Sequence, residues 1–377
     1  MKRKDILLKD SFWMKQQEDS SVVLSSRIRL ARNLDILPFP HILTLEEAKK
    51  AENIIAEVLR DIVVENEKLT YLALAELSAI EQQVLLEKHL ISNGLIKAAG
   101  PQGVALAQDH RCAVMVNEED HIRLQVLMPG NKLSETYRLA NLLDDTLEER
   151  LDFAYKEALG YLTACPTNVG TGMRASVMVH LPALALTHQV QQVLGALTHL
   201  GLAVRGIYGE GSQAHGHIFQ VSNQITLGKS EEDIVVHLKA VTGQIMEHEL
   251  QAREALRKQA NLSLEDKVWR ARGTLQNARL LTSDEAINLL SIDKMGTDMG
   301  ILPKVKQKFA ALLIGSHPGS LQYSLDQELN PGQRDEQRAR LFREAMKESG
   351  DKDRSRETED RSLETEIRSN NERTENI

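Results

Sequence analysis

The segment CAVMVNEEDHIRLQVLM, residues 112–128, carries the clearest fold signal in the chain. In its second half apolar side chains alternate with polar ones: Ile122, Leu124 and Val126 with His121, Arg123 and Gln125. A period of two is typical of a strand with one apolar face. The polar NEED turn separates this strand from the apolar run CAVMV, so we predict two strands joined by a turn. Arg123 and Gln125 then lie on the face opposite the apolar one.

Further short strings are rich in β-forming residues and separated by glycine or proline, so they also predict strands: VVLSSRIRLARN at 22–33, GYLTACP, ASVMVHLP, LAVRGIYG and HIFQVSNQ. Between these strings, apolar residues recur at helical spacing. Capping boxes at Thr44/Glu47 and Ser230/Asp233 predict two helices, the second reaching about residue 259. Leucine spacing predicts helices over 134–157 and 183–200. Consecutive strands with intervening helices favour an α+β fold, with an antiparallel sheet flanked by helices, over a doubly wound one.

Composition divides the chain into four regions. Residues 1–20 form a lead-in, 21–260 the α+β domain, 261–346 a helical C-terminal domain, and 347–377 a charged tail. Boxes at Ser263/Asp266 and Thr282/Glu285 predict helices in the third region. The tail interleaves charges and has almost nothing to bury, so we expect it to be disordered.

Overall composition restricts the class of protein. With 377 residues, 42% hydrophobic residues and a net charge of -8, the chain can bury a large core and lacks the broad basic field of a general nucleic-acid binder. The N-terminus has no apolar signal region, and no stretch approaches the roughly 18 apolar residues of a membrane span. The two cysteines, Cys112 and Cys165, lie in dissimilar surroundings. We therefore expect a soluble cytoplasmic protein without a structural disulfide.

Two strings imitate well-known motifs. GKS at 228–230 lacks the first glycine of a phosphate-binding loop, since Asn223 stands there, and a turn leading into the Ser230 cap is the better interpretation. His248-Glu249 lacks the second histidine of a zinc protease helix, since that position is Ala252. Histidine and cysteine spacing predicts no metal site in the protein.

Three strings carry the chemistry: NEEDHIR at 117–123, CPTNVGTGMRAS at 165–176 and RGIYGEGS at 205–212. They supply carboxylates, one thiol and three arginines. With SSRIRLARN upstream, and in this order and spacing, they resemble the guanidino kinase superfamily. The resemblance covers about residues 20–345 and is closest to the bacterial protein arginine kinases. SSRIR begins at residue 25, VSNQITLGKSEEDI follows the last string, and RDEQRA stands at 334–339, as in that branch.

The resemblance implies a guanidino kinase catalytic domain that uses ATP and Mg²⁺, with the metal held by ATP. The family's phosphate-binding positions fall on five residues: Arg27, Arg29, Arg123, Arg174 and Arg205. Phosphoryl transfer depends on positioning and charge neutralisation, which explains the arginines. Relatives that act on small guanidino compounds carry an additional helical domain before the SSRIR strand. Its absence here would leave an open site that admits an arginine on a protein chain.

The acceptor guanidinium must lose a proton as it attacks, because its pKa exceeds about 12. By family alignment Glu119 acts as the general base and Glu210 orients the acceptor fork. Cys165, as a thiolate beside the acceptor, would hold or polarise it. Structural alternatives exist for these positions: a solvated acidic loop for NEED, an edge-strand surface pair for Arg27 and Arg29, and a small buried residue for Cys165. We interpret Cys112, Asp120 and His121 as structural.

The RDEQRA string places Arg334 and Arg338 on one helical face with Asp335 beside them. Spacing alone favours ion pairs on the helix surface. The resemblance instead implies an allosteric phosphoarginine-binding site at Arg334, Asp335 and Arg338. Gln213, and His215 and His217 around Gly216, depart from the family pattern near the acceptor side, which puts substrate orientation in question.

Together the sequence predicts an ATP-dependent protein arginine kinase that marks its substrates for Clp-type proteolysis. Implied partners are proteins with exposed arginines, a zinc-binding activator, a Clp-type AAA+ unfoldase, a heat-shock repressor as substrate, and a second copy in a homodimer. We expect no direct nucleic-acid or membrane partner. Two alternatives stay open: a phosphagen kinase for free arginine or another small guanidino compound, and a non-catalytic phosphoarginine-binding adaptor.

Overall fold

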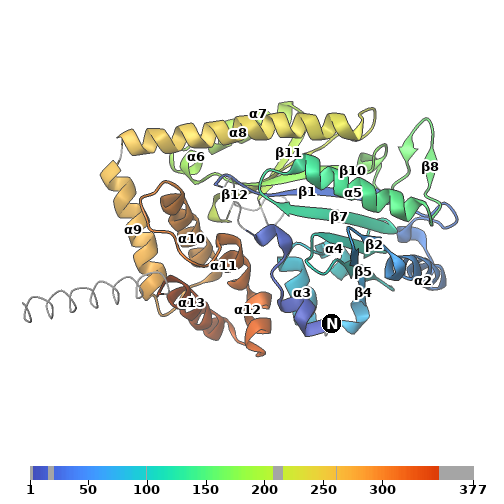
Figure 1. Ribbon diagram of the computed structural model, residues 1–377, viewed down its shortest axis with the longest axis horizontal. Coiled ribbons are helices and arrows are strands. Elements are labelled where there is room, and N and C mark those ends of the chain that lie inside the picture. The colour runs from blue at the N-terminus through green and yellow to red at the C-terminus, as the bar shows by residue number, and fades with distance from the viewer. Residues whose placement is uncertain (1–2, 16–20, 99, 207–214, 260, 348–377) are drawn as a thin grey trace, which may run out of the picture.

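The computed structural model describes residues 3–15, 21–98, 100–206, 215–259 and 261–347. Its centre is an eight-stranded sheet in the order β11-β12-β10-β1-β7-β6-β5-β4 (Figure 1). Every neighbouring pair is antiparallel. The strands are β1 Val23–Arg32, β4 Thr70–Ala73, β5 Gly103–Leu106, β6 Cys112–Val116, β7 Ile122–Pro129, β10 Met173–His180, β11 Leu202–Gly206 and β12 Ile218–Asn223. The predicted α+β fold with an antiparallel sheet is confirmed.

One face of the sheet is apolar and packs against helices. Ile28, Val126 and Ala175 lie side by side on it and belong to the largest buried cluster. Helices α5 Leu133–Glu148 and α8 Glu231–Gln259 contact this face, and α2 Leu45–Asp61 packs on the strands farther along (Figure 1). Burying this face is the main source of stability, because each buried Val, Leu or Ile side chain contributes about 1.5–3 kcal/mol.

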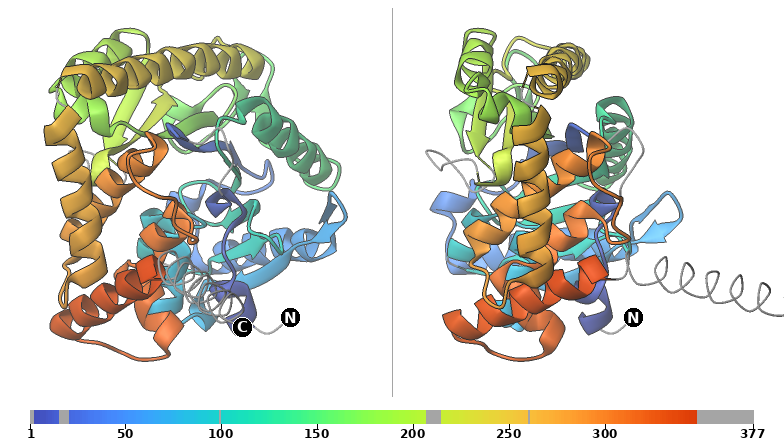
Figure 2. Two further views of the ribbon diagram at one scale, coloured as in Figure 1. Left: turned by 60° about the vertical axis from the view of Figure 1, so that its left-hand side comes forward. Right: turned by 90° about the vertical axis from the view of Figure 1, so that its left-hand side faces the viewer.

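The C-terminal helices form a separate group beside the sheet (Figure 2). They are α9 Asn261–Asn277, α10 Ser283–Asp298, α11 Phe309–Gly315, α12 Pro318–Leu325 and α13 Pro331–Lys347. Their apolar side chains share a second buried cluster with Leu127, Met178 and Ile218 of the sheet. The helices therefore cover one end of the sheet's second face.

Shorter helices complete the fold: α1 Arg3–Leu8, α3 Ala79–Glu87, α4 Asn93–Lys97, α6 Pro182–Leu186 and α7 Val190–His199. Two short hairpins pair β2 Val63–Val64 with β3 Glu67–Lys68, and β8 Tyr155–Lys156 with β9 Gly160–Tyr161. No helix among the described residues is long and apolar enough to cross a membrane.

Three predicted helix starts are confirmed by their capping hydrogen bonds. The hydroxyls of Thr44, Ser230 and Thr282 accept from the backbone N–H three residues on, at Glu47, Asp233 and Glu285. Such caps contribute about 1 kcal/mol each because they satisfy a donor that the helix leaves free. The turn predicted at 228–230 is also present, since it leads into the Ser230 cap.

Other predicted boundaries are wrong, and tertiary contacts explain them. The helix expected over 134–157 ends at Glu148, because the chain at Asp152 and Phe153 pairs with the end of β1. The helix expected over 183–200 is two helices, α6 and α7, separated where His188 adopts a left-handed backbone with φ 58°. GYLTACP gives a strand of two residues, after which the Leu162 N–H donates to the Ala154 carbonyl and the Ala164 N–H to the Asp120 carboxylate.

The Ser263 capping box is also wrong, because α9 already begins at Asn261. The predicted tail falls almost entirely on residues 348–377, outside the described residues. The division into four regions stays a prediction, although α8 ends at Gln259 and α9 starts at Asn261.

Candidate active site

A row of arginines crosses the second face of the sheet. Arg29 of β1 stands directly opposite Arg174 of β10 on one side and Gln125 of β7 on the other. Arg123 of β7 faces Ala31, and Arg205 of β11 faces Gln220 of β12. Directly opposed residues of antiparallel strands point to the same side. We call these five side chains the arginine row: Arg27, Arg29, Arg123, Arg174 and Arg205.

Neutral groups support the inner part of the row. The guanidinium of Arg27 donates to the Ser176 hydroxyl at 3.4 Å and to the Gln220 amide oxygen at 2.5 Å. The guanidinium of Arg174 donates to the Ser222 hydroxyl at 3.3 Å. The Nε atom of Arg29 is buried and has no hydrogen-bond partner in the described part of the chain. These supports orient the guanidiniums without neutralising them.

Arg27 and Arg29, at the centre of the row, form no ion pair with a carboxylate of the described residues. Burial, together with Arg174 and Arg123, lowers the pKa of Arg27 to about 10. Burial and the neighbouring arginines lower the pKa of Arg29 as well, and Glu118 opposes this shift. A polyanion would relieve this repulsion, since phosphate oxygens form strong charge-assisted hydrogen bonds with guanidinium groups.

The NEED turn lies at the edge of the row. Asn117, with a left-handed φ of 56°, starts the turn and donates to the carbonyls of Ala48 and Pro101. Glu118 is buried and lies 2.5 Å from Arg123 Nη1, whereas Glu119 is 43% exposed and lies 2.8 Å from Arg123 Nη2. Arg123 therefore links both carboxylates to the row.

Both carboxylates line one cavity of about 600 Å³. Its walls also include His41, Ala98 and Ala164. A cavity of this size suits a small ligand or a side chain. Two carboxylates are the natural partners for a planar guanidinium fork, so the cavity fits an arginine side chain.

Hydrogen bonds to Asp120, which we call the polar hub, connect the NEED turn to the loop that contains Cys165. The buried Asp120 carboxylate accepts from the Asn33 amide and from the Ala164 N–H, each at 2.7 Å. Burial raises the pKa of Asp120, and these hydrogen bonds oppose the rise. Cys165 follows Ala164, is partly buried, and has its Sγ 3.0 Å from the Thr167 hydroxyl. Cys165 therefore directly follows, in the chain, a residue that lines the cavity.

The predicted structural residues do have structural contacts. Asp120 forms the hub, and the buried His121 ring accepts from the Leu34 N–H at 3.2 Å. Cys112 is buried in the core. Of the predicted site residues, the structure brings the arginine row, Glu119 and Cys165 to one side of the sheet. Glu210 and Gln213 lie outside the described residues.

The RDEQRA residues lie on α13, away from the arginine row. The ion pair expected from spacing joins Arg338 to Asp335, but it does not lie on the helix surface, because Arg338 is 1% exposed. Its guanidinium donates to the carbonyls of Ser316 and Leu281 and to the Asp335 carboxylate, each at 2.7 Å. Arg334 is half-buried and donates to the Leu329 carbonyl at 2.8 Å. Spacing could not reveal this, because the acceptors come from distant loops.

Several site residues escaped the sequence analysis. Glu118 was not among the predicted site residues because family alignment assigned the base to Glu119, yet both carboxylates line the cavity. Gln220, Ser176 and Ser222 support the row from neighbouring strands. Their signal was present, since Ser176 and Gln220 each stand between two apolar residues and Ser222 follows Gln220 with the same two-residue period.

Comparison with known proteins agrees with this geometry. Residues 50–252 match the family model described as ATP:guanido phosphotransferase, C-terminal catalytic domain, and residues 261–358 match the protein-arginine kinase McsB C-terminal domain. A protein-arginine kinase of Moorella thermoacetica is 48% identical over 344 residues, which cover 90% of this chain and 98% of the relative. A second, from Geobacillus sp. (strain WCH70), is 48% identical over 340 residues, with 89% and 94% covered.

The chain belongs to the protein-arginine kinase family. It is a phosphotransferase enzyme, as predicted. Among solved structures it is similar to lombricine kinase, with a TM-score of 0.55 and 27% identity over 63% of this chain and 69% of that one. It is also similar to a taurocyamine kinase from Schistosoma mansoni with bound transition state analog components, with a TM-score of 0.56 and 26% identity over 70% of this chain and 40% of that one.

Proposed function

We propose that this protein transfers the γ-phosphoryl group of ATP to arginine side chains of protein substrates. The observation that carries the proposal is that a cationic region and an anionic region adjoin on one face of the sheet. Arg27 and Arg29 form no ion pair with a carboxylate of the described residues, and the adjoining cavity is lined by Glu118 and Glu119. The first suits nucleotide phosphates and the second suits a cationic acceptor.

In this mechanism the arginine row binds the phosphates and neutralises the charge that develops during transfer. Mg²⁺ would arrive bound to ATP, since the guanidinium groups of the arginine row cannot ligate a cation. Magnesium would supply further neutralisation of the phosphates. Arg27 and Arg29 are the residues best placed for the nucleotide, because neither is paired with a carboxylate of the described chain.

Glu119 is the residue we propose as general base. Its side chain is exposed toward the cavity, whereas Glu118 is fixed by the Ser92 hydroxyl at 2.6 Å and by Arg123. As a guanidino nitrogen bonds to the γ-phosphorus and the bond to the β-phosphate oxygen breaks, the nitrogen loses a proton to the Glu119 carboxylate. Cys165, and Glu210 from the third string, would orient the acceptor.

Phosphoarginine mass spectrometry under conditions that preserve acid-labile phosphate tests this function. An unfolded arginine-rich protein and free arginine are incubated with Mg-ATP and the wild type, Glu119→Gln, or the exposed control Glu46→Gln. We expect phosphoarginine on the protein, about 10²–10⁴-fold slower with Glu119→Gln and unchanged with Glu46→Gln. Phosphorylation of free arginine at an equal rate would make the protein a phosphagen kinase instead. Nucleotide binding without transfer to either acceptor would favour an adaptor.

Partners and regulation are proposals that rest on the family resemblance. We propose a zinc-binding activator, a Clp-type unfoldase, a heat-shock repressor substrate, homodimerisation, a cytoplasmic location and a route from phosphorylation to Clp proteolysis. We also propose phosphoarginine binding at the RDEQRA segment, with Arg334 and Asp335 facing the ligand and the buried Arg338 holding Asp335 in place. Because Arg338 is buried and partnered, Arg334→Ala is the cleaner test than a double charge reversal. If added phosphoarginine changes activity equally in wild type and Arg334→Ala, the allosteric role is wrong.

A further inference from the structure

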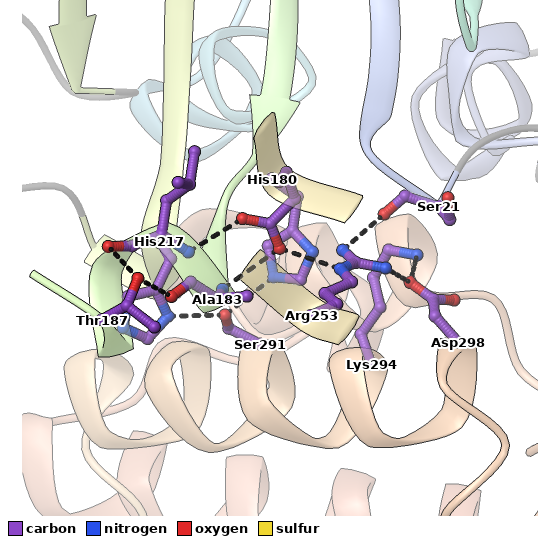
Figure 3. Close-up of polar contacts among 11 residues, drawn as sticks. Ser21, His180, Ala183, Thr187, His217, Arg253, Ser291, Lys294 and Asp298 are labelled. Carbon is purple, nitrogen blue, oxygen red and sulfur yellow. Dashed lines mark hydrogen bonds and ion pairs between the residues drawn. The ribbon is translucent and has the colours of Figure 1, made fainter. Parts of the chain in front are cut away.

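Helix α10 lies against the ends of the three strands at the centre of the arginine row. His180 ends β10, His217 directly precedes β12, and Ser21 lies two residues before β1. Each is connected to α10 by polar contacts that are separate from the site itself (Figure 3). The same strands carry Arg174, the Gln220 partner of Arg27, and Arg27 itself.

Ser291 of α10 joins two of these strand ends. Its hydroxyl lies 2.8 Å from His180 Nε2 and 2.8 Å from His217 Nδ1. A hydroxyl can donate to one ring and accept from the other, so one side chain fixes both imidazoles (Figure 3). Ser291 and His180 are fully buried, which strengthens these bonds and makes their loss costly.

The turn before β12 is held at a second point. The Gly216 N–H donates to the Asn288 side-chain oxygen at 2.9 Å. Gly216 has a left-handed φ of 63°, and a Cβ there would lie 2.5 Å from Cγ2 of Ile287. Only glycine fits this approach of the turn to α10. His215 adds an ion pair with Asp284 at 3.1 Å.

A third connection reaches the start of β1. Arg253 of α8 donates to the Ser21 carbonyl at 3.1 Å, and its guanidinium lies 3.5 Å from Asp298 of α10. The Asp298 carboxylate also accepts from Lys294 at 2.8 Å, so it binds two cations (Figure 3). The C-terminal end of α10 therefore fixes the segment that enters the strand bearing Arg27 and Arg29.

Only short stretches of strand separate these contacts from the side chains that support the arginine row. Gln220, which orients Arg27, comes three residues after His217, and Ser222, which orients Arg174, comes five residues after it. A strand that slides or rotates at its root moves these supports together, because a packed sheet transmits displacement along its strands.

We propose that Ser291 is a positioning residue for phosphoryl transfer: by tying His180 and His217 to α10 it sets the alignment of β10 and β12, and so of the arginine row. The proposal rests on the function proposed above. It makes the helical C-terminal group part of the catalytic architecture, acting through the sheet and touching neither nucleotide nor acceptor.

The test compares Ser291→Ala with Ser11→Ala. Ser11 is an equally buried serine, and its hydroxyl lies 3.1 Å from His110 Nδ1, so Ser11→Ala loses one buried serine–histidine hydrogen bond where Ser291→Ala loses two. Well below the unfolding temperature, we expect Ser291→Ala to lower kcat/KM for Mg-ATP and weaken Mg-ADP binding by about 5- to 10-fold. Ser11→Ala should stay within about twofold of wild type in both, although it also loses thermal stability.

Two variants of His217 provide the rescue. His217→Asn keeps a polar atom near the Nδ1 position and tolerates the left-handed φ of 55°, whereas His217→Ala does not replace the hydrogen bond. We expect His217→Ala to resemble Ser291→Ala, and His217→Asn to recover most of the Mg-ADP affinity. Equal Mg-ADP affinity in wild type, Ser291→Ala and His217→Ala would overturn the proposal. Mg-ADP affinity is measured by calorimetry, so the result stands even if the wild type transfers no phosphate to arginine.

Discussion

Two buried arginines and two half-buried ones have opposite surroundings in this protein. Arg338 of α13 and Arg32 of β1 are each 1% exposed and are satisfied by the protein itself. Arg338 has two carbonyls and Asp335, and Arg32 lies 2.6 Å from Asp144. Arg27 and Arg29, on the same strand as Arg32, have neutral partners or an unpaired Nε.

The presence or absence of matched acceptors within the protein distinguishes arginines with a structural role from arginines suited to binding a ligand. A buried cation with matched acceptors holds elements together, and removing it leaves those acceptors unsatisfied. A partly buried cation without such acceptors destabilises the protein that has no ligand bound. Binding of an anion removes part of that cost. Under the proposed function, nucleotide binding would offset the free energy that burying Arg27 and Arg29 costs in folding.

The largest expected effect comes from Arg29→Met. Because Arg29 has no carboxylate partner in the described structure, removing its charge should leave the unfolding temperature unchanged or raise it. Loss of one electrostatic donor at the transferring phosphate should lower kcat by about 10²–10³-fold. Steady-state kinetics and thermal unfolding of the same preparation measure both effects.

Arg32→Met is the matched control on the same strand. It leaves the Asp144 carboxylate buried beside Glu231, so we expect a clear loss of stability. If Arg29→Met destabilises the protein as much as Arg32→Met does, the distinction between the two kinds of arginine fails.

Arg338→Met tests the comparison at an arginine whose partners all come from the protein itself. The substitution removes the donors for the Ser316 and Leu281 carbonyls, which connect α13 to the loops before α12 and α10. We expect a loss of about 2–3 kcal/mol in the free energy of unfolding, from hydrogen bonds to a charged donor. Denaturant unfolding measures it, with the exposed Arg340→Met as control, for which we expect little change. Equal stability of the two variants would show that Arg338 is not a structural residue.

The sequence predicted local features well and tertiary ones poorly. Alternation placed Arg123 and Gln125 on the polar face, and capping boxes located the starts of three helices, because both depend on neighbouring residues. The surroundings of Arg338 depend on acceptors 22 and 57 residues away, which no spacing encodes. The family resemblance located Arg27 and Arg29, but their lack of carboxylate partners emerged only from the assembled sheet.

A third kind of buried cation forms only in acid. His121 Nδ1 accepts from the Leu34 N–H, so protonating that nitrogen would break the bond and create a buried charge. Burial accordingly lowers the pKa of His121 to about 4. The unfolded chain titrates near 6.5 and takes up the proton first, so stability is complete above about pH 6.5 and falls as pH drops toward 4.

His121→Asn tests this smallest effect. The asparagine side-chain oxygen can accept from Leu34 and does not titrate, so the variant should lose stability less steeply between pH 6.5 and 4. The difference in slope should be at most about 1.4 kcal/mol per pH unit for one proton. Urea unfolding at several pH values measures it; His89 and His110, whose pKa values burial lowers to about 3 and about 4, contribute the same background to both proteins. Parallel curves would mean that protonated His121 finds a partner, which would move it to the balanced group with Arg32 and Arg338.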